Sequence, residues 1–199
     1  MMIAFLLLAC GSSSSQQSQN IETSGFWNAS NERFQAYRVL DAGANPAKDT
    51  GFLNENLLLN QYQEAAGCDG AGWRVEFRQG STWNNADSAG ALHFFDANGL
   101  AICAYEDEEG NEVSVDGTVV LWDDQPLGDG QTIDSNAWSV TATQEEDVVT
   151  YYGVFPSATA FAIEGSGGTP SGWTLWFADE AGLILIENDD FTADLVYYR

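Results

Sequence analysis

The side chains of this sequence that could do chemistry are thirty acidic residues, three cysteines and one histidine. A single histidine, His93, excludes metal sites built on a histidine pair and leaves at most one Ser-His or Cys-His dyad. The sequence contains no G-x-S-x-G nucleophile elbow, H-E-x-x-H motif or phosphate-binding glycine loop. We therefore assign no catalytic residue and interpret His93 as a half-exposed strand residue. A hydrolase with two carboxylates, which needs a separation of about 5–9.5 Å, remains an alternative, but the sequence selects no pair.

Loops dense in carboxylates can bind calcium through several oxygens. The candidates here are Asp123, Asp124 and Asp129, which precede Gly130. The EF-hand spacing fails, because Gln125 falls at position one of the loop when Gly130 is placed at position six. Solvated turns are the favoured interpretation, so we expect no cofactor, with calcium as the alternative.

The net charge is −24, from thirty Asp and Glu against six Lys and Arg. This balance excludes a nucleic-acid partner, which requires clustered cations, and argues against electrostatic docking on anionic lipid. The acidic residues concentrate in expected turns and predict a soluble surface that repels its own copies. Such a surface also predicts stability that increases with salt concentration.

Two of the seven tryptophans stand in polar surroundings. Trp83 is followed by Asn84, Asn85 and Asp87 in a polar loop, and Trp173 follows a glycine-rich loop. An exposed tryptophan beside amides and carboxylates is typical of a site for a glycan or a protein partner. The alternative is a loop tryptophan that folds back onto the mouth of a barrel.

The start of the sequence contains a candidate targeting signal. An apolar run over residues 1–9 precedes Cys10, and Leu7-Leu8-Ala9-Cys10 resembles the lipobox of bacterial lipoprotein precursors. The resemblance implies a signal peptide over 1–9, lipid attachment at Cys10 and a place in the bacterial cell envelope, on the periplasmic or cell-surface face of a membrane. Residues 10–24 then form the lipidated cysteine and a flexible Ser/Gln-rich tether. The sequence departs from the pattern, since no Lys or Arg precedes Arg33; a secretory signal or a buried strand are the alternatives.

The two other cysteines, Cys68 and Cys103, predict a disulfide, because an exported compartment permits one. The bridge would close a loop of 35 positions, worth about 3.5–4 kcal/mol in the chain-entropy model. The alternatives are two buried free thiols or a metal-binding pair, which the lack of C-x-x-C spacing and the single histidine disfavour.

Residues 25–199 are expected to form one β-rich domain, an antiparallel β-sandwich or β-barrel. Short apolar alternations recur about every ten residues, for example Phe34 to Leu40 and Trp73 to Arg78. In the second, Trp73, Val75 and Phe77 share one face. The segment 53–66 is either a short helix or an irregular edge segment.

Two predicted hairpins, 92–100 and 175–183, share identical residues at five positions, which indicates either two hairpins that converged on the same turn chemistry or two related halves. Each has an Asp that opens the turn and a Gly, Gly99 or Gly182, for which a left-handed conformation is expected.

Gly25-Phe26-Trp27 is similar to the G-x-W of lipocalin-like barrels, and Arg199 ends the last expected strand. That resemblance implies a barrel that holds a small apolar ligand. We expect a lipid-anchored module that binds an envelope partner or glycan; the carrier and the hydrolase are the alternatives.

Overall fold

The computed structural model describes residues 20–21, 33–49, 57–67, 70–95, 99–113, 115, 117–123, 127–135, 137–166 and 170–199. The predicted signal peptide, Cys10 and the G-x-W motif lie outside these residues, as do Cys68 and Asp124. None of the described residues belongs to a helix long and apolar enough to cross a membrane.

Strands make up most of the described chain. Their bounds are β1 (Asn20–Ile21), β2 (Phe34–Asp41), β3 (Leu57–Gly67), β4 (Gly70–Gly80), β5 (Asp87–Phe95), β6 (Leu100–Glu106), β7 (Glu112–Val113), β8 (Val119–Trp122), β9 (Leu127–Gly128), β10 (Thr132–Ser135), β11 (Trp138–Val149), β12 (Val154–Gly165), β13 (Trp173–Ala178), β14 (Gly182–Glu187) and β15 (Phe191–Tyr198). A 3₁₀ turn, η1 (Trp83–Asn85), lies between β4 and β5.

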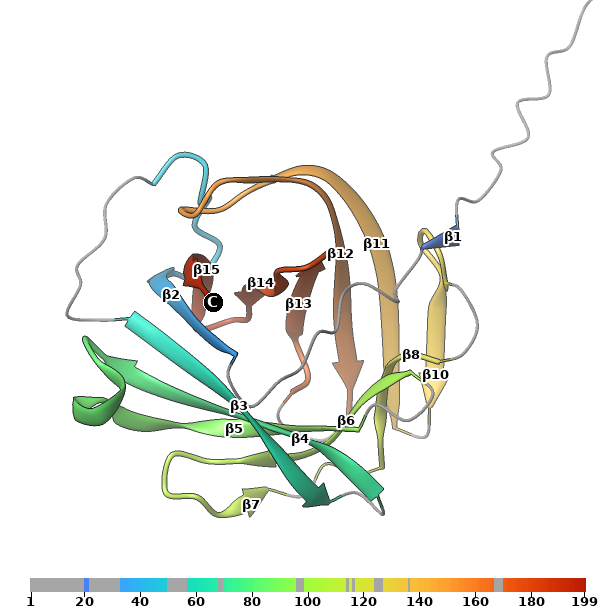
Figure 1. Ribbon diagram of the computed structural model, residues 1–199. Helices are drawn as coiled ribbons and strands as arrows, with labels where there is room; N and C mark the ends of the chain where they lie inside the picture. The colour runs from blue at the N-terminus through green and yellow to red at the C-terminus, as the bar shows by residue number, and fades with distance from the viewer. Residues whose placement is uncertain are drawn as a thin grey trace, which may run out of the picture.

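Thirteen of these strands form one antiparallel sheet, and twelve of them follow one another in a continuous order that is nearly closed into a barrel (Figure 1). The order is β10-β11-β12-β13-β14-β15-β2-β3-β4-β5-β6-β7, and β8 pairs with β6 beside β7. Where the sheet would close, the Ser135 hydroxyl at the end of β10 donates to the Thr118 carbonyl oxygen beside β8, at 2.8 Å. The all-β expectation is confirmed, and of its two forms the structure has the barrel.

The two alternatives for 53–66, a short helix and an irregular edge segment, are both wrong for its described part, because residues from Leu57 onward form the regular strand β3. This segment pairs on both sides, with β2 and with β4. Leu58 and Tyr62 point into the core. Pairing with two neighbours and burial of alternate residues outweigh the helix propensity of its Leu, Gln and Glu residues.

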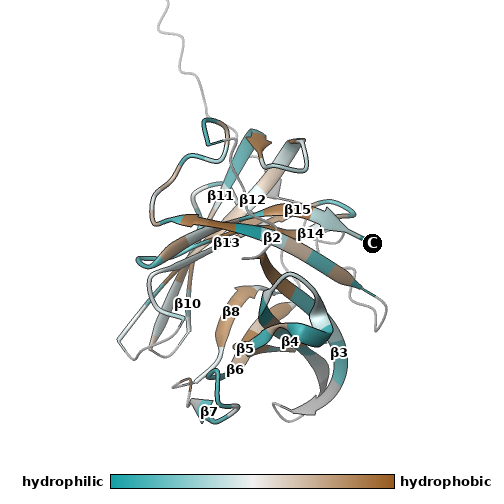
Figure 2. Ribbon diagram, turned by 90° about the vertical axis from the view of Figure 1, so that its left-hand side faces the viewer, coloured by the Kyte–Doolittle hydropathy of each residue, from teal (hydrophilic) through white to brown (hydrophobic). Residues whose placement is uncertain are grey.

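The core occupies the inside of the barrel and follows strand alternation. Val75 and Phe77 of β4 are buried as predicted, while Arg74, Glu76 and Arg78 face outward and form ion pairs. Figure 2 shows hydrophobic residues along β8, whereas β2 alternates between hydrophobic and hydrophilic positions.

The two predicted hairpins are present as β5–β6 and β13–β14. Gly182 has the expected left-handed backbone, with φ of +74°. Gly99 does not; a Cβ there would lie 2.3 Å from the Trp122 carbonyl oxygen, so glycine is required by the close approach of β8. The relation between the two halves stays a prediction.

One end of the barrel is closed by buried polar side chains. Gln35 Oε1 accepts hydrogen bonds from Tyr37, Asn60 and Tyr62, at 2.9–3.2 Å. Its Nε2 donates to two carbonyl oxygens of the β13–β14 turn region. The buried guanidinium of Arg33 donates to the same turn and lies over the Tyr62 ring. Buried side chains therefore fill the barrel interior at this end.

Candidate functional site

A cavity of about 270 Å³ lies inside the barrel at the end opposite Arg33 and Gln35. We call it the barrel cavity. Val39 of β2 and Leu58 of β3 line the barrel cavity. They face the inside of the barrel, as Gln35 and Asn60 do, but stand further along the same two strands. Gln79 and Asp190, which stand at its edge, are exposed to solvent. The cavity is therefore open at this end.

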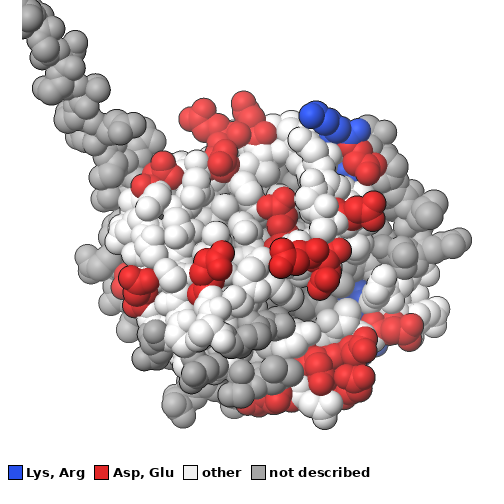
Figure 3. All heavy atoms as spheres, turned by 180° about the vertical axis from the view of Figure 1, so that it is seen from behind, with Lys and Arg blue, Asp and Glu red and all other residues white. Residues whose placement is uncertain are grey.

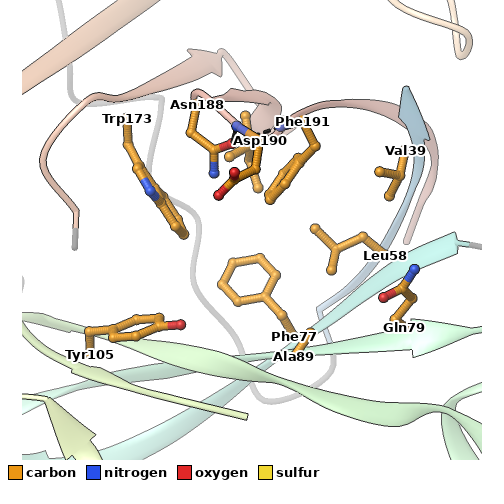
Figure 4. A pocket seen from close by; sticks show the side chains of 11 residues that line it. Val39, Leu58, Phe77, Gln79, Ala89, Tyr105, Trp173, Asn188, Asp190 and Phe191 are labelled. Carbon is orange, nitrogen blue, oxygen red and sulfur yellow. Dashed lines mark hydrogen bonds between the residues drawn. The ribbon is translucent and has the colours of Figure 1, made fainter. Parts of the chain in front are cut away.

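Four of the eleven side chains that line the cavity are aromatic (Figure 4). Phe77 and Tyr105 project from β4 and β6, and Trp173 and Phe191 from β13 and β15 on the opposite side of the barrel. Tyr105 and Trp173 meet edge to face, with ring centroids 6.4 Å apart and an interplanar angle of 72°. These rings, from strands far apart in the sequence, face one space.

Gly90 makes room for one of these rings. Its backbone φ is +95°, and a Cβ would lie 3.3 Å from the Tyr105 ring and 2.4 Å from the Glu106 carbonyl oxygen. Burial, together with the negative charges of Asp107 and Glu108, raises the pKa of Tyr105. Its phenol therefore stays protonated at neutral pH.

The amide and carboxylate groups of the barrel cavity stand at its rim. Asn188 Oδ1 accepts hydrogen bonds from the backbone N–H groups of Asp190 and Phe191, both at 2.9 Å, in the turn between β14 and β15. The Asp190 carboxylate and the Asn188 amide both point into the cavity, and Gln79 faces them from β4 (Figure 4). The described lining contains one charged residue, Asp190, and no Lys, Arg or His.

Of the residues predicted to bind a ligand, only Trp173 lines the barrel cavity. Trp83 lies elsewhere: the Arg78 guanidinium stacks 4.7 Å from its ring centroid, and Phe34 meets it edge-on at 6.2 Å. Trp83 thus folds back, as the alternative interpretation held, but onto the outer wall. Asn84 and Asn85 are exposed in the same turn, and Asp87 pairs with Gln79 across β4–β5.

Of the three calcium candidates, Asp123 and Asp129 lie in the described part of the chain. Asp129 Oδ1 caps a turn by accepting the Gln144 backbone N–H at 2.8 Å, and Asp123 is exposed. Within the described part of the chain, no three acidic, cysteine or histidine side chains are arranged to hold a metal ion.

His93 lies on the outer face of β5, half-buried as expected. Its Nε2 is 2.5 Å from Glu106 Oε1, and Arg74 donates to both oxygens of the same carboxylate at 2.7–3.2 Å. Hydrogen bonds from Arg74, reinforced by His93, lower the pKa of Glu106 to about 2. Cys103, on β6, has its sulfur 3.4 Å from the His93 carbonyl oxygen.

A second hollow, of about 380 Å³, lies on the outer face of the barrel. The turn after β2, the acidic end of β11 and the outward side chains Trp176, Leu185 and Glu187 line it. The Trp176 indole N–H donates to Glu187 Oε2 at 3.1 Å, so both polar groups are already paired.

Sequence reasoning missed most of the barrel cavity. Phe77 and Tyr105 were recognisable as strand residues, but their convergence depends on the closure of the sheet. One local signal pointed to Asn188 and Asp190. Asn188 stands at the start of a turn, where an Asn side chain accepts hydrogen bonds from the backbone N–H groups two and three residues later.

No family model, curated protein or solved structure matches this chain.

Proposed function

We propose that this chain binds a small ligand with an aromatic or aliphatic body inside its barrel, as a carrier does. The observation that supports this most directly is the barrel cavity, which is open at one end and walled by aromatic rings from both sides of the barrel. Concave, mostly apolar sites with a few placed polar groups are the usual form of small-molecule sites.

The position of the tryptophans favours an interior ligand over a surface glycan. Trp83, the main candidate for a surface site, has one face covered by Arg78 and an edge contact with Phe34. Trp173, in contrast, presents its ring to the cavity (Figure 4).

The volume sets the size of the ligand. An apolar cavity of about 150 Å³ accepts benzene, and drug-sized ligands occupy about 300–1,000 Å³. A cavity of about 270 Å³ therefore suits a molecule with one or two rings.

The test is calorimetric titration with 1-naphthylmethanol, a neutral two-ring probe. We expect saturable 1:1 binding that is weakened at least about tenfold by Ala89→Phe or Val39→Phe, each of which fills the cavity from one wall. Trp83→Ala is the control and leaves the affinity unchanged. Melting curves establish that each variant is folded. Absence of binding, or unchanged affinity in both filled variants, would overturn the proposal.

We further propose that the barrel is held at a bacterial membrane by lipid on Cys10. The support is the run Leu7-Leu8-Ala9-Cys10 and the polar residues that follow it. More than one acyl chain is needed for stable anchoring, which a lipidated N-terminal cysteine supplies. Palmitate labelling of the expressed chain, lost in Cys10→Ser and accompanied by globomycin sensitivity, is the expected result; unlabelled and freely soluble protein contradicts it.

The disulfide between Cys68 and Cys103 belongs to the same proposal, because export permits it. Denatured, unreduced Cys10→Ser protein should show no free thiol, and two after reduction. Two thiols before reduction would contradict the pairing.

A further inference from the structure

Building on the proposed function, we propose that the ligand of the barrel cavity is a small organic cation, an amine or ammonium group on an aromatic or aliphatic body. Three features favour a cation: the charge of the rim, the aromatic faces of the wall and the electrostatic field of the whole surface.

The Asp190 carboxylate on the rim presents a negative charge to the cavity. Because Asn188 Oδ1 accepts the backbone N–H groups of Asp190 and Phe191, the turn that carries Asp190 is fixed by two hydrogen bonds. Its carboxylate points into the cavity, and no described lining residue is a cation that could neutralise it (Figure 4). A ligand ammonium would supply the missing partner, with a charge-assisted hydrogen bond.

The wall is suited to the same charge. Tyr105 and Trp173 form an edge-to-face corner, and Phe77 and Phe191 complete four aromatic side chains around the space. The π face of each ring carries partial negative charge and attracts a cation within about 6 Å, most strongly for tryptophan. The same rings would hold the apolar body of the ligand.

The electrostatic field around the molecule also favours a cation over an anion. With a net charge of −24, the molecule concentrates cations near its surface and repels carboxylates and phosphates. Asp107 and Glu108 extend that field to the cavity wall, since their charges help to raise the pKa of Tyr105. Fatty acids and other anionic ligands are therefore disfavoured at this site.

The experiment compares three probes with the same two-ring body and different charges: 1-naphthylmethylamine, 1-naphthylmethanol and 1-naphthylacetate. At pH 7 and low salt, we expect the amine to bind at least about tenfold more tightly than the alcohol and the acetate to bind most weakly. In Asp190→Asn, the amine and the alcohol should bind within about threefold of each other. Asp189→Asn, which removes an exposed charge one residue away and outside the lining, is the matched control and keeps the preference.

The outcomes separate this inference from the proposed function. If the alcohol binds and the amine binds no better, the cation preference is overturned while the carrier proposal stands. If no probe binds, both fail. A preference that survives Asp190→Asn, or that Asp189→Asn reduces equally, would overturn the role given to the Asp190 carboxylate.

Discussion

Charged side chains on the outer wall of β4 to β6 form a compact network. Glu106 accepts from Arg74 and contacts His93, and Glu76 accepts from Arg74 and Arg78 at 2.6–2.7 Å. Burial opposes ionisation of Glu76, but the hydrogen bonds from both arginines prevail and lower its pKa. Because the pairs are partly exposed, each one alone contributes little to the free energy of unfolding. The network contributes more than any single pair, because its side chains are shared between pairs.

Glu106→Gln should lower the free energy of unfolding at pH 7 by about 1 kcal/mol, the upper range for partly exposed pairs. Because the folded-state pKa of Glu106, about 2, lies below its ordinary value, its stabilisation is present above about pH 5 and is lost as the pH falls toward 2. Urea unfolding of both proteins at several pH values measures this. The exposed Glu108→Gln serves as control. A difference between wild type and Glu106→Gln that stayed constant from pH 6 to pH 2.5 would contradict the assignment.

At the residue scale, the sequence identifies which residues of a strand share a face, but not which of the two faces points into the barrel. In 34–40, Gln35, Tyr37 and Val39 point inward, although Gln35 is polar. It is buried because Tyr37, Asn60 and Tyr62 donate to it, and those donors lie up to 27 positions away. Polar groups that satisfy one another across strands leave no local signature.

At the scale of elements, the outer face of β15 and β2 is covered as well as the inner face. The far end of the β11–β12 hairpin curls over it (Figure 1), and Tyr152 N–H donates to the Leu195 carbonyl oxygen at 2.8 Å. Beneath this cover, Arg38 Nε donates to Asp194 Oδ1 at 2.6 Å, and Tyr151 N–H donates to Asp194 Oδ2 at 2.6 Å. Arg38 also donates to the carbonyl oxygens of Pro46 and Asp49.

Arg38→Met should therefore destabilise the fold by about 3–5 kcal/mol, because it leaves the Asp194 carboxylate buried without its cation. Amide hydrogen exchange should also accelerate at 45–49 and 150–153, the two segments that the pair joins to β2 and β15. Denaturant unfolding and exchange mass spectrometry provide the two measurements. Arg78→Met, at a partly exposed pair on the same barrel, is the control and costs about 1 kcal/mol or less. Equal losses in the two variants would show that the covering layer contributes nothing.

The elements themselves were mostly predictable, because alternation of apolar residues and turn residues such as Gly182 are local. The segment 57–67 was not, since its composition permits a helix and only pairing with β2 and β4 decides for a strand. The barrel cavity was harder still. Trp173 stood out by its position after a glycine-rich loop, but Phe77 and Phe191 come together only when the sheet curves into a barrel.

At the scale of the whole molecule, acidic charge is the dominant surface feature. Figure 3 shows acidic side chains spread across one face with few basic ones among them. Of the five arginines, Arg33, Arg38, Arg74 and Arg78 already bind carbonyl or carboxylate oxygens of the fold. Little positive charge is therefore left to offset repulsion between the acidic turns.

Stability should consequently increase with salt. Between about 0.01 M and 1 M NaCl the Debye length falls from about 30 Å to about 3 Å, which screens repulsion among exposed acids far more than the buried Arg38–Asp194 pair. We expect the melting temperature to rise by several degrees, measured by circular dichroism, with KCl giving the same result as NaCl. A variant carrying Glu145→Gln, Glu146→Gln and Glu164→Gln, three exposed acids, should melt higher at low salt and respond less to added salt. A melting temperature that stayed level or fell as salt was added would show that self-repulsion does not limit the stability of this barrel.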